Sequence, residues 1–191
     1  MSPLNSYQDC KTCSINIWAQ RSRKPWLWLC TGPKSPSGRW LFSHNGRVDG
    51  WPESAAGLAM TLPAAALLGL EARVDSALLW ALVRHRLDHG LAPAEALADT
   101  VGALRAAGVT GRFNFLLTDG QLITATAAGD TLWYRLSRPT VVVASEPGDD
   151  EPGWTEVPGD SVVTATAGRV DVTPLSAPGL QVPSNGRIAI S

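Results

Sequence analysis

The order of the secondary-structure signals along the chain constrains the fold more than any other feature. Two helical patterns lie between residues 75 and 108, and closely spaced strand signals follow from residue 112 onward. Helices and strands segregated in this way favour an α+β architecture of packed layers over a parallel sheet of alternating β and α units. We therefore predict antiparallel sheets covered by helices.

The strand signals are strongest around a predicted hairpin. Residues 112–118 and 121–127 are rich in apolar and β-branched side chains, and Asp119-Gly120 between them is typical of a tight turn. The segment 146–160 is rich in proline and glycine, and we expect it to be a loop. Further strands are predicted at residues 131–136, 140–145, 161–166 and 169–173.

Both helical patterns have recognisable ends. Asp75 is suited to cap a helix whose apolar residues recur at intervals of three and four, with Gly90 as its stop. A second helix is expected to begin near Pro93 and to end at Gly108. Because their apolar residues recur at helical spacing, each helix should pack one face against the sheet.

An apolar segment precedes these helices. We expect residues 53–70 to be helical in part, with interruptions at Gly57 and Pro63. Its apolar run, residues 58–70, contains Pro63 and is too short to cross a bilayer. The N-terminus also lacks the pattern of a secretory signal, so we expect a cytoplasmic protein.

Composition narrows the classes of partner. The 191 residues are 45% hydrophobic and 17% charged, which suffices for one substantial core. A formal net charge of -1 gives no general electrostatic reason to bind nucleic acid or an anionic membrane. We therefore expect neither as a partner, and the oligomeric state is left open.

The cysteines do not form a recognisable framework. Cys10, Cys13 and Cys30 are an odd number of thiols in a chain without an export signal, which argues against structural disulfides. Together with His44 they offer four potential zinc ligands, but their spacing matches no regular zinc finger. We expect free thiols and no metal.

Two polar clusters could each be either a cation-binding site or an ordinary solvent-exposed surface. His85 and His89 are four residues apart on a predicted helix and could share a metal, yet the spacing supplies no third ligand. Residues 149–151 are acidic and could bind a cation, but an acidic run bounded by proline and glycine is usually an exposed loop. In both cases a solvated surface is favoured.

Asn45-Gly46 is the strongest candidate for a chemical site. The pair follows a short strand predicted at residues 39–43, and Asn-Gly pairs commonly form hairpin turns. An Asn amide beside a Gly backbone N–H also offers two donors for the oxyanion of a tetrahedral acyl-transfer intermediate. The pair alone does not distinguish a turn from an oxyanion hole.

The succession of motifs from residue 38 to about 175 resembles the class II glutamine amidotransferases, which are N-terminal-nucleophile hydrolases. The resemblance is strongest to the ergothioneine-biosynthesis amidohydrolase branch. It rests on several short motifs in order: residues 40–46 (WLFSHNG), 74–77 (VDSA), 112–116 (RFNFL), 129–132 (GDTL), 144–147 (ASEP), 149–150 (DD) and 153–154 (GW).

The resemblance implies a four-layer αββα sandwich and a set of site residues. In that family Asn45 and Gly46 would supply the oxyanion-hole donors, and Asp75 would bind the α-amino group of a glutamine or γ-glutamyl substrate. The alternative for Asp75 is a helix N-cap, which would occupy its carboxylate with backbone N–H groups. Both alternatives stay open at this point.

The family nucleophile has no counterpart in the sequence. It is a cysteine at position 2, whose own α-amino group serves as the base after removal of Met1. Position 2 is Ser2 here, so no nucleophile is identified. Residues 1–38 also lack a convincing equivalent of the family's substrate-binding arginine. We therefore expect an N-terminally incomplete fold in which the catalytic segment is missing or replaced.

These observations divide the chain into three parts. Residues 1–38 stay unassigned and do not match the family, residues 39–175 form the amidotransferase-like domain, and residues 176–191 are expected to be a flexible tail.

The implied activity is hydrolysis of a γ-glutamyl amide. The substrate implied by the resemblance is γ-glutamyl-hercynylcysteine sulfoxide in ergothioneine biosynthesis, and no cofactor is required. One alternative is a glutaminase domain that supplies ammonia to a synthase. The other is a truncated domain that binds γ-glutamyl compounds without catalysis.

Overall fold

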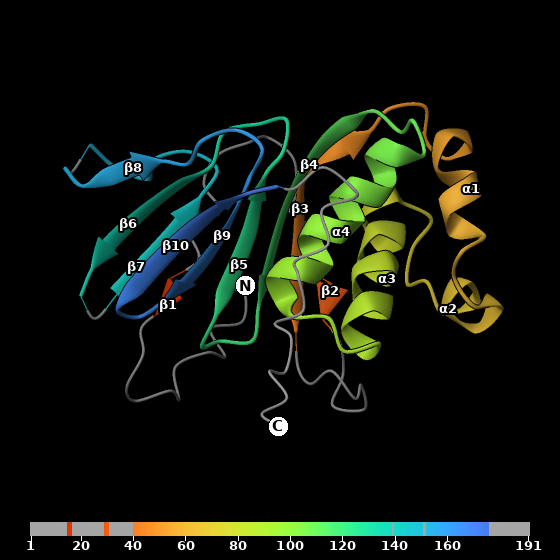
Figure 1. Cartoon of the computed structure of the whole chain (residues 1–191), viewed down its shortest axis with the longest axis horizontal. Coiled ribbons are helices and arrows are strands. Elements are labelled where there is room, and N and C mark those ends of the chain that lie inside the picture. Colours follow the sequence, from red (N-terminus) through yellow and green to blue (C-terminus); the bar gives the residue numbers. More distant parts are fainter. Residues whose placement is uncertain (1–14, 17–28, 31–39, 139, 151, 176–191) are drawn as a thin grey trace, which may run out of the picture.

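The computed structural model describes residues 15–16, 29–30, 40–138, 140–150 and 152–175 (Figure 1). The predicted tail and most of the unassigned N-terminal part lie outside the described residues. The same holds for Ser2, Cys10 and Cys13. Within the described part, no helix has the length and apolar character that a membrane crossing needs.

The helices agree well with the sequence patterns. The two longest helices are α3 and α4, which begin and end within two residues of the predicted limits. Pro63 does interrupt the apolar segment, whereas Gly57 lies inside a short helix. The helical elements are η1 (Glu53–Ala55), α1 (Ala56–Ala59), α2 (Ala64–Leu68), α3 (Asp75–Asp88) and α4 (Pro93–Ala106).

The strands form two sheets. The larger sheet has the order β10-β9-β5-β4-β3-β2 and is antiparallel throughout, whereas the smaller sheet has the order β1-β7-β6-β8. The strands are β1 (Ile15–Asn16), β2 (Leu29–Cys30), β3 (Leu41–Val48), β4 (Gly111–Thr118), β5 (Ile123–Ala127), β6 (Trp133–Ser137), β7 (Thr140–Ala144), β8 (Trp154–Glu156), β9 (Ser161–Thr166) and β10 (Arg169–Pro174).

The elements stack as helices, large sheet and small sheet. Figure 1 shows the helices on one side of β3 and β4, and the small sheet at the opposite side of the molecule. The α+β class and the two stacked sheets are thus as predicted. Of the four predicted layers, the described residues supply three.

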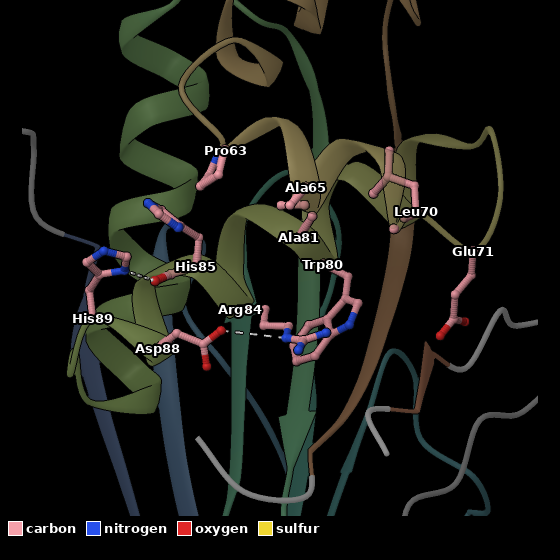
Figure 2. A pocket seen from close by; sticks show the side chains of 13 residues that line it. Pro63, Ala65, Leu70, Glu71, Trp80, Ala81, Arg84, His85, Asp88 and His89 are labelled. Carbon is pink, nitrogen blue, oxygen red and sulfur yellow. Dashed lines mark hydrogen bonds and ion pairs between the residues drawn. The ribbon is translucent and has the colours of Figure 1, made fainter. Parts of the chain in front are cut away.

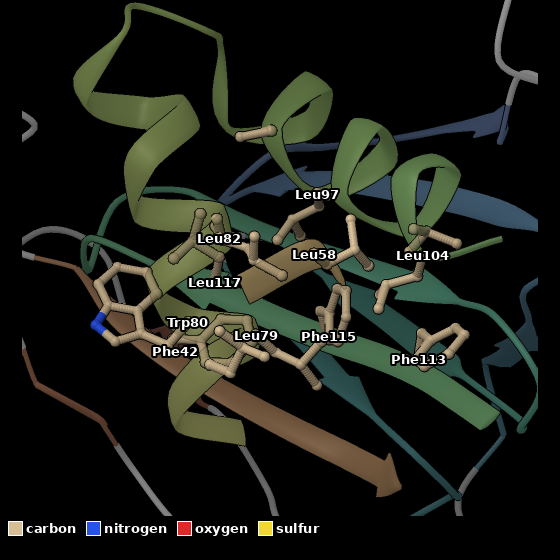
Figure 3. Close-up of a cluster of buried hydrophobic side chains, with 14 of the residues drawn as sticks. Phe42, Leu58, Leu79, Trp80, Leu82, Leu97, Leu104, Phe113, Phe115 and Leu117 are labelled. Carbon is tan, nitrogen blue, oxygen red and sulfur yellow. The ribbon is translucent and has the colours of Figure 1, made fainter. Parts of the chain in front are cut away.

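Two hydrophobic clusters hold these layers together. The first lies between α1, α3 and α4 and one face of β3 and β4, where Phe42, Leu79 and Leu97 are almost fully buried (Figure 3). Phe42 stacks on Trp80 with ring centroids 5.4 Å apart. The second joins β5 and β9 to β6 and β7. Each fully buried large side chain contributes about 1.5–3 kcal/mol.

One strand of the Pro/Gly-rich segment was not foreseen. β8 lies inside the segment predicted to be a loop, and it pairs with β6 in antiparallel register. Arg135 of β6 accounts for part of this pairing, because its guanidinium lies 4.9 Å from the ring centroid of Trp154. The strand therefore depends on a partner distant in sequence.

Asn114 fastens the loop that follows β5. Its side chain is buried, with 4% of its surface exposed. The Oδ1 atom accepts hydrogen bonds from the backbone N–H groups of Ala128 and Asp130, at 2.8 and 3.2 Å. The Nδ2 group donates to the carbonyls of Asp130 and Thr131, both at 3.0 Å. One amide thus satisfies four backbone groups.

We expect Asn114→Ala to destabilise the protein by about 2–4 kcal/mol, because it leaves buried backbone groups without partners. Urea unfolding followed by circular dichroism measures this change. A loss below about 0.5 kcal/mol would mean that water replaces the amide without cost.

Candidate functional site

Asn45 and Gly46 lie inside strand β3 and not in a turn. The hairpin turn that Asn-Gly pairs commonly form does not occur here, because β3 pairs with β4 without interruption from Leu41 to Val48. The chain reverses only after the strand, where Gly50 has a φ of +67°. Cross-strand pairing therefore overrides the turn preference of the Asn-Gly pair.

Asn45 faces away from the helices. Phe42 and Val48 belong to the core beneath the helices, and His44 contacts Phe115 of the same core. Since side chains alternate along a strand, Asn45 projects from the opposite face, beside its cross-strand partner Asn114. Asn45 is half-buried, and its side-chain amide makes no hydrogen bond to another described residue. The amide is available for a ligand.

The backbone N–H of Gly46 points to the outer edge of β3, away from β4. The backbone N–H of Val48 donates to Asp75 Oδ2 at 2.9 Å, so it does not face β4. In β4, the N–H of Phe113, which lies opposite Gly46, donates to Ala128 on the other side. In an antiparallel pair, N–H groups two residues apart point to the same edge. The N–H groups of Gly46 and Val48 therefore share one edge with the Asp75 carboxylate.

Gly46 also permits a close approach between the two strands. Its φ is +157°, and a Cβ added there would lie 2.0 Å from the carbonyl oxygen of Arg112. Both the conformation and the contact exclude a side chain. The close approach of β4 thus requires glycine at position 46, whether or not this residue takes part in a reaction.

Asp75 joins the start of α3 to the end of β3. It is the first residue of the helix, after Val74 at the N-cap position, so the predicted N-cap role was wrong by one residue. Its Oδ1 accepts the N–H of Ser76 at 2.7 Å, and its Oδ2 accepts the N–H of Val48. A carboxylate at the first turn is favoured by the helix dipole. Each oxygen retains acceptor capacity for a ligand cation.

His44 lies close enough to both Arg112 and Asp75 for their charges to act on its imidazole. Its Nε2 lies 2.9 Å from the carbonyl oxygen of Arg112, and this assigns the proton to Nε2, since a carbonyl only accepts. Burial lowers the pKa of His44 below its ordinary value of 6.5, and the positive charge of Arg112 adds to this. The hydrogen bond to Arg112 and the negative charge of Asp75 act in the opposite direction. His44 is therefore neutral near pH 7.

A lowered pKa makes stability depend on pH. Between the pKa of folded His44 and 6.5, the unfolded chain binds more protons, so the free energy of unfolding decreases as the pH falls through this range. We expect His44→Gln to lose this part of the pH dependence. Urea unfolding of both proteins at about pH 7.5 and about pH 5.5 measures the difference. If both proteins lose the same free energy of unfolding between these two pH values, groups other than His44 cause the pH dependence.

A charged pair lies on the same face as Asn45. Arg112 is opposite Arg47 in the β3–β4 pair, and its Nε is 3.5 Å from Asp130 Oδ2. Asp130 is held by the loop that Asn114 fastens, and its Oδ1 accepts the N–H of Thr131 at 2.9 Å. The pair is partly exposed and close to the candidate oxyanion donors along the strands.

A separate cavity lies between α2 and α3 (Figure 2). It has a volume of about 480 Å³, and the residues that line it include Trp80, Arg84, His85 and His89, but neither Asn45 nor Asp75. His89 Nδ1 donates to the His85 carbonyl at 2.7 Å. Among the described residues, no group of three potential metal ligands occurs. The two imidazole rings contact each other, with centroids 4.2 Å apart.

In the acidic segment predicted at residues 149–151, the Asp149 carboxylate is bound by neighbouring side chains. Asp149 accepts hydrogen bonds from Arg135 at 2.8 Å and from the Trp154 indole at 3.0 Å. It therefore fastens this segment to β6 and β8. Glu151 lies outside the described residues.

Sequence reasoning did not identify His44, Arg112 or Asp130 as part of the site. Arg112 and Asp130 lie in motifs that carried the family resemblance, but no spacing rule links them to Asn45. Only the register of β3 and β4 brings them together. The pairing of strands separated by more than sixty residues was the missing information.

The sequence has curated relatives in mycobacteria. It is 40% identical over 139 residues to the γ-glutamyl-hercynylcysteine sulfoxide hydrolase of Mycolicibacterium smegmatis, which corresponds to 72% of this chain and 53% of that protein. It is 38% identical over 143 residues to the hydrolase of the same name from Mycobacterium tuberculosis H37Rv, covering 75% of this chain and 54% of that one. The chain thus spans about half the length of the curated relatives it matches.

No family model matches the sequence, but solved structures do. A glutamine aminotransferase class-II domain protein from Silicibacter pomeroyi aligns over 73% of this chain and 69% of its own, with a TM-score of 0.60 and 26% identity. The glutamine phosphoribosylpyrophosphate amidotransferase of B. subtilis aligns over 78% of this chain and 31% of its own. The TM-score is 0.53 and the sequence identity is 15%, so this similarity shows a common fold and nothing about function.

The predicted resemblance is therefore confirmed at the level of fold and sequence relationship. The motifs that suggested it lie on β3, α3 and β4, in the loops around β6 and β7, and at the start of β8. The chain has the fold of the class II glutamine amidotransferases, and it is a homologue of the mycobacterial γ-glutamyl-hercynylcysteine sulfoxide hydrolases.

Proposed function

We propose that this chain is an amidohydrolase of the class II glutamine amidotransferase type that cleaves a γ-glutamyl amide. The proposed substrate is γ-glutamyl-hercynylcysteine sulfoxide, the compound in the names of its relatives. The observation that carries the proposal is the common edge of β3 shared by the Gly46 N–H and the Asp75 carboxylate. The reaction would take place in the cytoplasm, as predicted from the sequence.

The proposed chemistry assigns one role to each residue. When a nucleophile attacks the γ-amide carbon, the carbonyl oxygen becomes an oxyanion, which the Asn45 amide and the Gly46 N–H would stabilise. Asp75 would hold the α-ammonium group through a charge-assisted hydrogen bond. The amine half then departs with a proton, and water releases glutamate from the acyl intermediate. The nucleophile is not assigned among the described residues.

Glutamate release by the full chain tests the proposal. The chain is incubated with γ-glutamyl-hercynylcysteine sulfoxide and with glutamine, and glutamate is measured by mass spectrometry. Faster release from the first substrate would support the proposal, whereas release from glutamine alone would favour a glutaminase. Binding of the γ-glutamyl compound without release would identify a non-catalytic binding domain.

The mature N-terminus is measured in the same experiment. A mass that corresponds to loss of Met1 would show that Ser2 is the terminal residue. Activity that survives blocking of the terminal amine would exclude a terminal nucleophile of the family type.

A further inference from the structure

We propose that the guanidinium of Arg112 binds a carboxylate group of the γ-glutamyl substrate, with Asp130 as its counter-charge when no substrate is bound. This inference rests on the proposed function and adds a specificity-determining residue to it. The carboxylate has two possible sources: the glutamyl half of the substrate or the amine half that is released.

Arg112 lies beside the candidate oxyanion donors. Arg112 lies opposite Arg47, and Asn45 is two residues before Arg47 on the same face of the strand pair. Diagonal neighbours of this kind are about 7–8 Å apart, within the reach of an arginine side chain. The carbonyl oxygen of Arg112 also contacts the His44 ring at 2.9 Å. A ligand at Asn45 therefore lies within range of the guanidinium.

The guanidinium of Arg112 is only partly paired within the described part of the chain. Its only ion pair within the described part of the chain joins Nε to Asp130 at 3.5 Å, and its two terminal amino groups donate to no other described residue. Arg47, in contrast, makes a hydrogen bond to Asp49 at 2.9 Å. The planar fork of Arg112 is thus the group available for bidentate binding of a carboxylate.

Charged side chains surround the strand that carries the candidate oxyanion donors. Two arginines directly opposite each other repel, so the pairing of Arg47 with Arg112 is unfavourable for stability. Arg112 lies on β4, which pairs with one edge of β3, and the Asp75 carboxylate accepts the Val48 N–H at the other edge of β3. A guanidinium and a carboxylate thus flank the strand that holds the oxyanion donors. Each of the two groups can thus bind one oppositely charged group of the substrate.

The loop after β5 holds Asp130 beside Arg112 and leaves part of the Arg112 guanidinium able to bind a ligand. Gly129 has a φ of +103°, and a Cβ there would lie 3.2 Å from Arg112 Cα, so the loop packs directly on the backbone of Arg112. Asn114 holds the backbone of Asp130 on both sides. Asp130 thereby stays beside Arg112 and balances its charge when no substrate is bound.

Binding measurements on the full chain test this inference without requiring turnover. The probes are L-γ-glutamyl-ethylamide, which has a carboxylate only on the glutamyl half, and γ-glutamylcysteine, which has one on each half. Isothermal titration gives Kd for the natural protein and for Arg112→Gln. We expect Arg112→Gln to weaken binding by about 10- to 100-fold. Weakening of both probes assigns the glutamyl carboxylate, and weakening of γ-glutamylcysteine alone assigns the amine half.

Arg47→Gln is the matched control, since it removes the opposite arginine from the same face. It should change Kd by less than about threefold. Arg112→Lys should recover only part of the affinity, because it keeps the charge but not the fork. Thermal unfolding of each variant verifies folding, and Asp130→Asn, which keeps the guanidinium, should bind at least as tightly as the natural protein.

The outcomes separate the two proposals. If the natural protein binds the probes and Arg112→Gln binds them equally well, this inference is overturned and the proposed function stands. Equal weakening by Arg47→Gln would also overturn it, because the effect would then be one of general charge. If the natural protein binds neither probe, this inference is overturned, whereas glutamate release from γ-glutamyl-hercynylcysteine sulfoxide decides the proposed function separately.

Discussion

Asn45→Ala is expected to lower kcat for glutamate release by about 10² to 10³, with a much smaller effect on KM. The variant removes one of the two proposed oxyanion donors, and this donor acts only when negative charge develops on the substrate oxygen. Asn45 makes no hydrogen bond within the described part of the chain, so its removal should leave the fold intact. Steady-state assays with γ-glutamyl-hercynylcysteine sulfoxide measure the effect.

Gln121→Ala is the control for this variant. It also removes a side-chain amide, but from the exposed turn between β4 and β5. We expect it to retain the natural rate. If Asn45→Ala behaves like Gln121→Ala, Asn45 takes no part in the reaction.

Gly46→Ala is expected to destabilise the protein by about 2–4 kcal/mol and to abolish activity. The added Cβ would lie 2.0 Å from the Arg112 carbonyl oxygen and 2.7 Å from the Arg112 carbonyl carbon. These are backbone atoms, so the two strands must separate to accommodate the methyl group. Urea unfolding gives the stability, and the glutamate assay gives the activity.

The matched control is Gly57→Ala. Gly57 lies in α1, and a Cβ there would have no atom within 4 Å. Alanine is preferred over glycine in a helix by about 1 kcal/mol, so this variant should be unchanged or more stable. Equal stability of Gly46→Ala and Gly57→Ala would mean that β3 and β4 tolerate separation at this point.

The helices were predictable because their signals are local. Apolar spacing in α3 and Pro93 at the start of α4 lie within single turns of the sequence, and both helices occur where predicted. The predicted hairpin also forms, because Asp119-Gly120 and the flanking strands carry consistent signals. Agreement between several local preferences made these elements recognisable.

Two of the errors concern structure that depends on distant partners. Asn45-Gly46 is a strong turn signal, yet eight consecutive pairs with β4 keep it in a strand. β8 occurs in a Pro/Gly-rich segment because β6 offers an edge for pairing and Arg135 a stacking partner for Trp154. Neither contact leaves a trace in the local sequence.

The candidate site was predictable in part. Asn45, Gly46 and Asp75 were identified by resemblance, and Gly46 and Asp75 prove to share one edge of β3. Their roles in catalysis and binding remain predictions. The steric need for Gly46, the neutral His44 and the loosely held Arg112 follow from strand register, which the sequence does not reveal.

The central claim is that the Asn45 amide and the Gly46 N–H converge on one substrate oxygen beside Asp75. The most direct measurement is a crystal structure of the chain with bound L-glutamate, the expected product. We expect one γ-carboxylate oxygen within about 2.7–3.2 Å of both Asn45 Nδ2 and the Gly46 nitrogen, with the ammonium group at Asp75. Glutamate bound elsewhere, or with its γ-carboxylate out of reach of both donors, would contradict the account.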